Sequence, residues 1–493
     1  MSSAVAHQVP VEVRHDADAI ADALGQHRPT PEQKAVIEAP LAPLLVVAGA
    51  GSGKTETMSA RVVWLVANEL VRPEEVLGLT FTRKAAGELA ERIGRRLRRL
   101  ERVGLWTPHV DDDGTPGLGD SPTVSTYHAY AGRIVREHGL RLGVEPDSRM
   151  LSEAASWQLA HAVVTAYDGP VDALERTERT ITADVVDLAG QLAEHLRTPE
   201  ELLAHDLRLV EAIDALPFGA GLRSLGEDVK KLRDTALSRT QVVPMLQRYA
   251  ELKRERSALD FADQMSVAAR LAQAFPVVGQ RERQQFRAVL LDEFQDTSEA
   301  QLVLLESLFA AEGERVPVTA VGDPHQSIYG WRGASATTLA AFRDRFRDAD
   351  GPARVVPLST SWRNDAAVLD AANHAAGPLR DASLVPVTTL RPRPGAGIGA
   401  VLAERHLTAA DEARGVAEWV RGRWFDDEGH RTGATAAVLC RKRSQFPAVA
   451  EALSAAGLPV EVVGIGGLLT TPEVNDLVSL LWVVQDPSRG DRL

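Results

Sequence analysis

The sequence is poor in cysteine, in aromatic residues and in long apolar runs. A single cysteine, Cys440, excludes a disulfide framework and any metal cluster built on cysteine ligands. The 13 histidines show no paired ligand spacing, so we expect no structural metal. No apolar run approaches the length of a bilayer span, and residues 1–25 hold no apolar signal-peptide core. We therefore expect a cytoplasmic protein without membrane contact.

Positive charge is also in deficit, because 55 lysines and arginines face 68 acidic residues and the net charge is −13. This balance argues against non-specific coating of nucleic acid, although it says nothing about a local groove. The length of 493 residues predicts two to four domains, and the 44% of apolar residues is typical of soluble globular proteins.

Residues 43–55 carry the clearest chemical signal. An apolar run at 44–47 is typical of a parallel strand buried on both faces, and apolar residues recur at helical spacing over 57–66. The glycine-rich turn between them ends in Lys54, which can reach terminal phosphates, and Thr55, whose hydroxyl can bind Mg²⁺. The alternative is a tight turn without ligand, which the Lys-Thr pair disfavours. The predicted phosphate-binding residues are Ala48, Gly49, Ala50, Gly51, Ser52, Gly53, Lys54 and Thr55.

Polar groups suited to phosphoryl chemistry follow two later predicted strands. The strand at 286–291 ends in Asp292, expected to hold Mg²⁺ through water, and Glu293, expected to orient and deprotonate the attacking water. After a strand at 316–321, the neutral amide of Gln326 can sense the γ-phosphate. Near the N-terminus, Gln33 lies in a capped helix start and can read the adenine edge, because an amide both donates and accepts.

Three segments combine hydroxyl, basic and aromatic side chains, as sequence-tolerant single-strand binders do. Their members are Thr80, Phe81, Thr82, Arg83 and Lys84; then Thr126, Tyr127 and His128; then Tyr329, Trp331 and Arg332. The third segment follows Gln326 closely, so it can link the ATP state to the grip on nucleic acid. The basic run at 92–102 is either a solvated helix face or a nucleic-acid contact.

Taken in order, these motifs resemble the UvrD/Rep group of superfamily 1 DNA helicases. The matching segments are residues 30–33, 48–55, 79–86, 125–128, 260–263, 292–296, 321–334 and 358–364. The resemblance covers residues 28–485 and implies an α/β P-loop NTPase with two RecA-like parallel-sheet domains, the second incomplete. It implies that Gln33 contacts adenine, that Trp362 stacks on it and that Arg363 reaches the γ-phosphate as an arginine finger.

The resemblance also implies the activity and the partners. We expect an ATP- and Mg²⁺-dependent helicase that binds single-stranded DNA and 3′-tailed duplex DNA and steps 3′ to 5′ in repair or recombination. The long insertion, Trp362 in place of the usual Tyr and Glu56 in place of a frequent Arg look closer to helicase subunits of actinobacterial recombination complexes. That likeness would imply a nuclease domain and a partner helicase or nuclease subunit. An RNA motor and a non-catalytic ATP- and DNA-binding module remain alternatives.

We expect five regions along the chain. They are a flexible arm (1–27), the first part of RecA-like domain 1 (28–137), a helical insertion (138–255), the second part of domain 1 (256–350) and the start of domain 2 (351–493). Domain 2 should hold strands at 398–403, 436–441 and 460–463 and helices at 412–424 and from 472. The family's later motifs should lie beyond Leu493, so we expect either a fragment or a truncated product.

Overall fold

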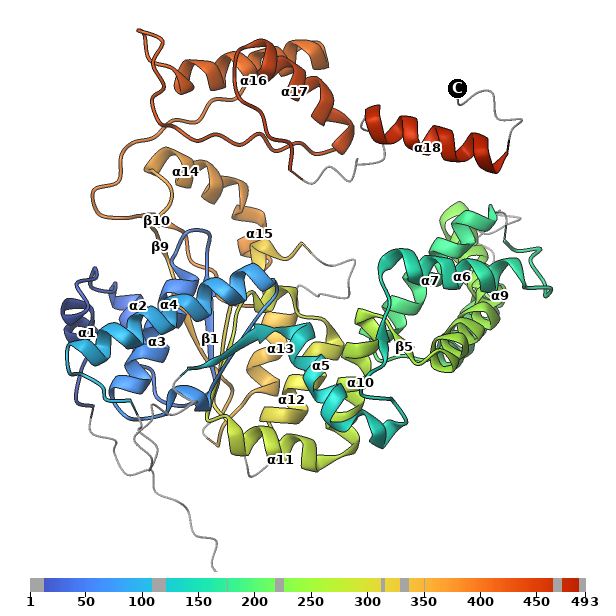
Figure 1. The fold of residues 1–493 in the computed structure, drawn as a ribbon, viewed down its shortest axis with the longest axis horizontal. Helices are drawn as coiled ribbons and strands as arrows, with labels where there is room; N and C mark the ends of the chain where they lie inside the picture. The colour runs from blue at the N-terminus through green and yellow to red at the C-terminus, as the bar shows by residue number, and fades with distance from the viewer. Residues whose placement is uncertain are drawn as a thin grey trace, which may run out of the picture. The chain divides into compact units, whose positions relative to one another are not determined.

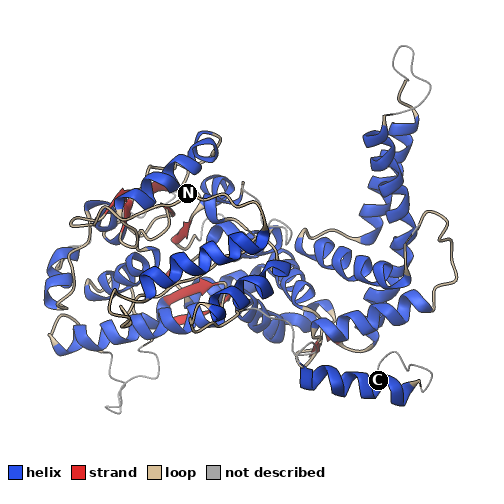
Figure 2. Cartoon of the chain, turned by 90° about the horizontal axis from the view of Figure 1, so that it is seen from above, coloured by secondary structure: helices blue, strands red, loops and turns tan. Residues whose placement is uncertain are grey.

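A six-stranded parallel sheet organises the first part of the chain. The computed structural model describes residues 13–108, 121–174, 176–217, 226–311, 315–328, 337–349, 351–463 and 472–486. Its contacts divide the chain into unit 1, residues 1–400, and unit 2, residues 401–493. Figure 1 shows the elements in chain order, and Figure 2 shows how far helices outnumber strands. Within the described residues, every strand belongs to unit 1.

The sheet has the strand order β3-β2-β6-β7-β1-β8, and all its pairs are parallel. Its strands are β1 (Leu44–Ala48), β2 (Val76–Thr80), β3 (Thr123–Thr126), β6 (Ala288–Leu291), β7 (Val318–Gly322) and β8 (Arg354–Leu358). The four central strands are buried along their whole length, as expected of parallel strands covered on both faces. The loops that follow β1, β6, β7 and β8 therefore meet at one edge of the sheet.

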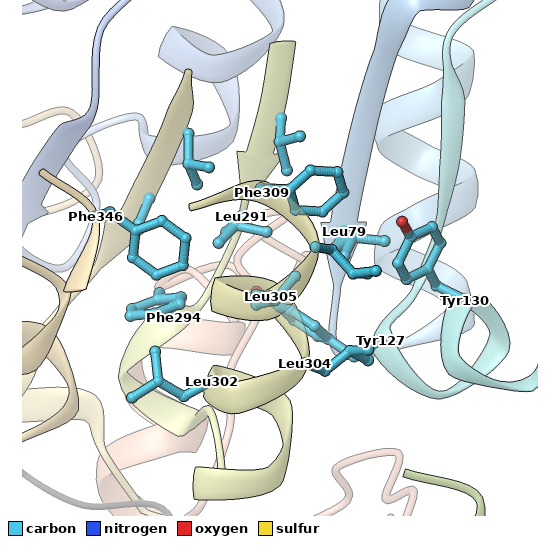
Figure 3. Close-up of a cluster of buried hydrophobic side chains, with 14 of the residues drawn as sticks. Leu79, Tyr127, Tyr130, Leu291, Phe294, Leu302, Leu304, Leu305, Phe309 and Phe346 are labelled. Atoms are coloured by element: carbon cyan, nitrogen blue, oxygen red, sulfur yellow. The ribbon is translucent and has the colours of Figure 1, made fainter. Parts of the chain in front are cut away.

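Helices cover both faces of this sheet. One face carries α1 (Ala17–Ala23), α2 (Pro31–Ile37), α3 (Lys54–Ala67) and α4 (Arg83–Arg102). The other carries α5 (Tyr127–His138), α10 (Phe261–Ala274), α11 (Pro276–Gln285), α12 (Glu299–Phe309) and α13 (Thr338–Arg345). Alternate residues of β1 serve the two layers: Leu44 and Val46 pack on the α3 side, and Leu45 and Val47 on the α12 side. Figure 3 shows the aromatic and leucine packing of the α12 side.

Four helices between α5 and α10 form a separate hydrophobic core. They are α6 (Glu153–Thr165), α7 (Glu178–Glu194), α8 (Pro199–Asp214) and α9 (Glu227–Glu255). Where this insertion begins and ends, β4 (Arg149–Met150) pairs in parallel with β5 (Ala258–Leu259). Inside it, the fully buried Asp206 accepts two hydrogen bonds from Arg239, at 2.8 and 2.6 Å, which compensates the buried charge.

Short elements complete the described chain. Unit 1 continues with β9 (Thr360–Ser361), α14 (Ala366–Ala375), α15 (Gly377–Asp381) and β10 (Arg391–Pro392), and β9 pairs in parallel with β10. Unit 2 holds α16 (Ala409–Trp424), α17 (Phe446–Ala455) and α18 (Pro472–Gln485), so both predicted helices are confirmed. In the described part of the chain no helix is long and apolar enough to cross a membrane.

Two sequence-based expectations need correction. The boundary at residue 350/351 is wrong, because β8 pairs with β1 and completes the first sheet, and unit 1 extends to residue 400. The strands expected at 398–403, 436–441 and 460–463 are not formed in the described residues of unit 2. Residues 436–440 and 458–463 instead line a hollow of about 510 Å³ against α16 and α17. Their apolar pattern was read correctly, but no neighbouring strand pairs with their backbone.

Candidate nucleotide-binding site

The turn between β1 and α3 has the geometry of a phosphate-binding loop. Gly51 and Gly53 have φ angles of +74° and +82°, which side chains disfavour, and Gly53 caps α3 without a side-chain hydrogen bond. The backbone N–H groups of the first helical turn, together with the helix dipole, favour an anion at this position. Gln33 donates from Nε2 to the carbonyl of Ser52 at 3.3 Å, so helix α2 braces the loop from its outer side.

The Lys54 ammonium lies between this loop and the carboxylate pair after β6. Lys54 Nζ is 2.9 Å from Glu293 Oε2, although the two residues are 239 positions apart in the chain. Glu293 has a φ of +50°, an uncommon conformation for a residue with a side chain and one that clusters at functional sites. The sequence predicted that these groups share one edge of the sheet, and their contact confirms that placement.

Gln295, which the sequence reasoning missed, links this carboxylate to the loop after β7. Its Nε2 donates to Glu293 Oε2 at 2.9 Å, and its Oε1 accepts from the N–H of Asp323 at 3.0 Å. Asp323 in turn accepts from Gln326 Nε2 at 2.7 Å. The predicted phosphate-sensing amide is therefore connected to Glu293 through two intermediates. No periodicity marks Gln295, because its position depends on the left-handed turn at Glu293.

Asp292 is almost fully buried, and its charge is unfavourable there. Burial, followed by repulsion from Glu293, raises the pKa of Asp292 to about 6, while Lys54 acts in the opposite direction. A divalent cation would offset this clustered negative charge, and carboxylate and hydroxyl oxygens are the ligands that Mg²⁺ prefers. Thr55, in the first turn of α3, supplies such a hydroxyl at the same edge of the sheet. These residues thus fit a magnesium nucleotide.

The segment after β8 passes directly over the phosphate loop. Trp362 donates from its backbone N–H to the carbonyl of Gly51 at 2.8 Å. A Cβ atom at Gly51 would lie only 2.7 Å from Ser361 Oγ and from Arg363 Cβ, so only glycine leaves room for this approach. The structure therefore brings Trp362 and Arg363 to the loop that holds Lys54, and both side chains are exposed.

A groove of about 990 Å³ lies where α5, α10 and α7 converge. Four predicted nucleic-acid contacts line it, namely Phe81, Arg83, Thr126 and His128. Two further residues of the groove, Arg136 and Phe261, were not predicted. The Phe261 ring is 55% exposed and stands edge-on to His128 with centroids 5.7 Å apart. The signal for Phe261 was present, because it lies within the 260–263 segment that carries the resemblance.

The structure contradicts the prediction for two side chains. Thr80 and Tyr127 are buried, and Tyr127 donates its hydroxyl to the carbonyl of Asp292 at 3.1 Å. Burial, then the Asp292 charge, raises the pKa of Tyr127 well above its usual value. Thr80 ends the buried strand β2, and the first turn of α5 directs Tyr127 into the core. Neither side chain can reach DNA in this position.

Other predicted contacts lie elsewhere. Thr82 caps α4 by accepting from the Ala85 N–H, and Lys84 is exposed beside Glu88. Tyr329, Trp331 and Arg332 lie outside the described residues. In the basic run, Arg96 is buried and pairs with Glu56 of α3, so this arginine serves neither of the two roles considered for the run.

Comparison with known proteins agrees with this geometry. The profile of the UvrD/REP helicase N-terminal domain matches residues 29–347. The chain is 28% identical to the ATP-dependent DNA helicase PcrA of Leuconostoc citreum over 456 residues, 92% of this chain and 52% of that protein. It is 29% identical to the ATP-dependent DNA helicase UvrD1 of Mycobacterium tuberculosis over 479 residues, 96% and 53% of the two chains. It is 27% identical to DNA helicase II of Escherichia coli over 453 residues, 92% and 54%.

The chain thus spans about half the length of the curated relatives that it matches. The profile covers most of unit 1, including the phosphate loop, the carboxylate pair and the helical insertion. The predicted α/β P-loop fold with a RecA-like parallel sheet is confirmed. The chain belongs to the UvrD/REP helicase family.

Proposed function

We propose that this chain is the ATP-binding portion of a DNA helicase or translocase, which couples ATP hydrolysis to movement along single-stranded DNA. The observation that carries the proposal is the contact between Lys54 and Glu293 beside the segment of Arg363. It joins a phosphate loop, a carboxylate pair and a mobile-range cation source from three distant parts of the chain. Such a constellation serves phosphoryl transfer mainly by positioning and by stabilising charge.

Each residue has a proposed role in hydrolysis. The loop N–H groups and Lys54 hold the phosphates, Gln33 and Trp362 contact the base, and Thr55 and Asp292 hold Mg²⁺. The metal supplies charge neutralisation at the phosphates when it is bound. Glu293 orients the attacking water and accepts its proton. Gln326 senses the γ-phosphate, and Arg363 stabilises the charge that develops as the bond breaks.

We place single-stranded DNA in the groove of about 990 Å³. Arg83 and Arg136 offer positive charge there, Thr126 offers a hydroxyl, and the exposed Phe261 ring offers a stacking surface. The preference for 3′-tailed duplexes, 3′ to 5′ stepping, a role in repair or recombination and a cytoplasmic location are part of the proposal. The partner helicase or nuclease subunit stays a prediction, since no described contact bears on it.

The proposal is tested with purified chain, ATP, Mg²⁺ and oligonucleotides. We expect ATP hydrolysis that single-stranded DNA stimulates, and we expect Lys54→Ala to abolish it without lowering the unfolding midpoint. Strand displacement is then compared on duplexes with 3′ and with 5′ single-stranded tails. Stimulation that persists in Lys54→Ala would show that the phosphate loop is assigned wrongly.

Two alternatives predict different outcomes in the same assays. An RNA motor would respond more strongly to an RNA strand of matched sequence than to DNA, because phosphate and stacking contacts do not distinguish the sugars. A non-catalytic module would bind ATP and DNA without turnover. The close contact of Lys54 with Glu293 favours a catalytic site over such a module, because an inactive site has no need of it.

A further inference from the structure

Helix α2 is tied to the exit of β8 by a pair of hydrogen bonds that no catalytic role accounts for. The Glu32 carboxylate accepts from the backbone N–H of Ser359 at 2.6 Å through Oε2 and from the Ser359 hydroxyl at 2.5 Å through Oε1. Ser359 is 4% exposed, so these bonds are sheltered from water. The two residues are 327 positions apart in the chain.

The same helix also touches the phosphate loop. Gln33, next to Glu32, donates to the Ser52 carbonyl of that loop. From the other side, the backbone N–H of Trp362 donates to Gly51 of the same loop. Helix α2, the loop and the 359–363 segment therefore form a closed ring of contacts, in which each member holds the other two.

The geometry points to Glu32 and Ser359 as positioning residues that place Arg363 at the phosphate loop. Only four residues separate Ser359 from Arg363, and β9 between them pairs with β10, which limits its freedom. A carboxylate that accepts two donors from one residue fixes both the position and the direction of the backbone there. Losing this latch leaves the phosphate loop and Lys54 in place but lets the Arg363 segment drift. A displacement of about 1 Å in a catalytic group is enough to cost roughly 10²-fold in rate.

This inference rests on the proposed function, because Arg363 matters only if the site hydrolyses ATP. It predicts a specific pattern in which the latch affects turnover more than binding. Glu32→Ala, which removes both bonds, should lower the DNA-stimulated kcat at least tenfold while changing the Kd for ATP less than threefold. Ser359→Ala keeps the backbone bond and should have a smaller effect, and Ser359→Thr, which restores the hydroxyl, should recover most of the rate.

The decisive comparison is a double-mutant cycle with Arg363→Ala in the full chain. If Glu32 acts through Arg363, the double variant should turn over no more slowly than Arg363→Ala alone. Glu418→Ala, at an exposed position of α16, serves as the matched control and should leave kcat and Kd unchanged. Losses that multiply in the double variant, or a Kd that rises as much as kcat falls, would overturn the inference.

Amide hydrogen exchange supplies a readout that does not depend on turnover. Glu32→Ala should speed exchange in residues 359–363 while β1 and β7 stay protected, even if the parent chain hydrolyses no ATP. Absence of turnover in the parent refutes the proposed function, whereas unchanged exchange at 359–363 refutes the latch. The two failures are therefore distinguishable.

Discussion

Replacing Arg61 by methionine should destabilise unit 1 and loosen the helix that carries Gln33. Arg61 belongs to α3, is 2% exposed, and makes five hydrogen bonds. The acceptors are the carbonyls of Val36, Ile37, Ala39 and Pro40 and the hydroxyl of Thr319. Burial lowers the pKa of Arg61 to about 10, so the guanidinium is still charged at neutral pH. This one cation caps the C-terminal end of α2 and ties it to α3.

The size of the effect follows from these contacts. A hydrogen bond to a charged group contributes about 1.5–3 kcal/mol, and each buried carbonyl left without a donor costs about 1–3 kcal/mol. The terms do not add, because methionine also removes the cost of burying a charge and the chain relaxes. We therefore expect Arg61→Met to lower the free energy of unfolding by about 3–5 kcal/mol. Arg61→Lys, with fewer donors, should fall between methionine and the parent.

Urea unfolding followed by amide hydrogen exchange measures this change where it occurs. Exchange should accelerate first in α2, since the helix loses its C-terminal donors. The matched control is Arg95→Met on α4, whose side chain is 68% exposed and pairs only with Glu91, and it should change stability by less than about 0.5 kcal/mol. If Arg61→Met remains within about 1 kcal/mol of the parent, or if α2 keeps its protection, the assigned role of Arg61 is wrong.

Three other variants test the site and its surroundings. Glu293→Gln should retain ATP binding and slow hydrolysis by orders of magnitude, because only the proton acceptor is lost, and loss of binding in an equilibrium assay would make Glu293 structural. Gly51→Ala should weaken ATP binding at least tenfold, since its Cβ would meet Ser361 Oγ at 2.7 Å, and an unchanged Kd argues against that close approach. Burial lowers the pKa of His138 in the folded protein, so stability is full above the unfolded pKa of about 6.5 and falls as the pH drops through it. His138→Asn should flatten this acid-side loss of the unfolding midpoint, and an unaltered pH profile would mean that other groups cause it.

The sequence was informative wherever burial on both faces left a continuous apolar run. Strands β1, β2, β6 and β7 were recognisable for this reason, and parallel strands end at a common edge, so Lys54 and Glu293 could be expected together. Strand β8 was also recognised but assigned to the wrong domain. It is only partly buried at the edge of the sheet, and nothing in its sequence states which sheet it joins.

Single side chains were harder to place than elements. Tyr127 and His128 are neighbours at the start of α5, where successive residues point about 100° apart. One therefore packs in the core and the other lines the groove, and their shared polar and aromatic character did not separate them. Arg96 looked like part of a basic surface, but one turn of α4 faces α3 and buries it. Such outcomes depend on long-range packing rather than on local pattern.

The position of β1 within the sheet has a consequence for how the protein is made. Strand β1 is complete by Ala48, yet its two neighbours are β7 and β8, which pair with it through Thr319–Gly322 and Arg354–Leu358. At a synthesis rate of about 5–20 residues per second, the ribosome needs roughly 15–60 s to reach them. Throughout that interval the strand that carries the phosphate loop has two unpaired, apolar edges, whereas β2 and β3 can already pair with each other. The nascent chain should therefore depend on chaperones most strongly until β8 has emerged.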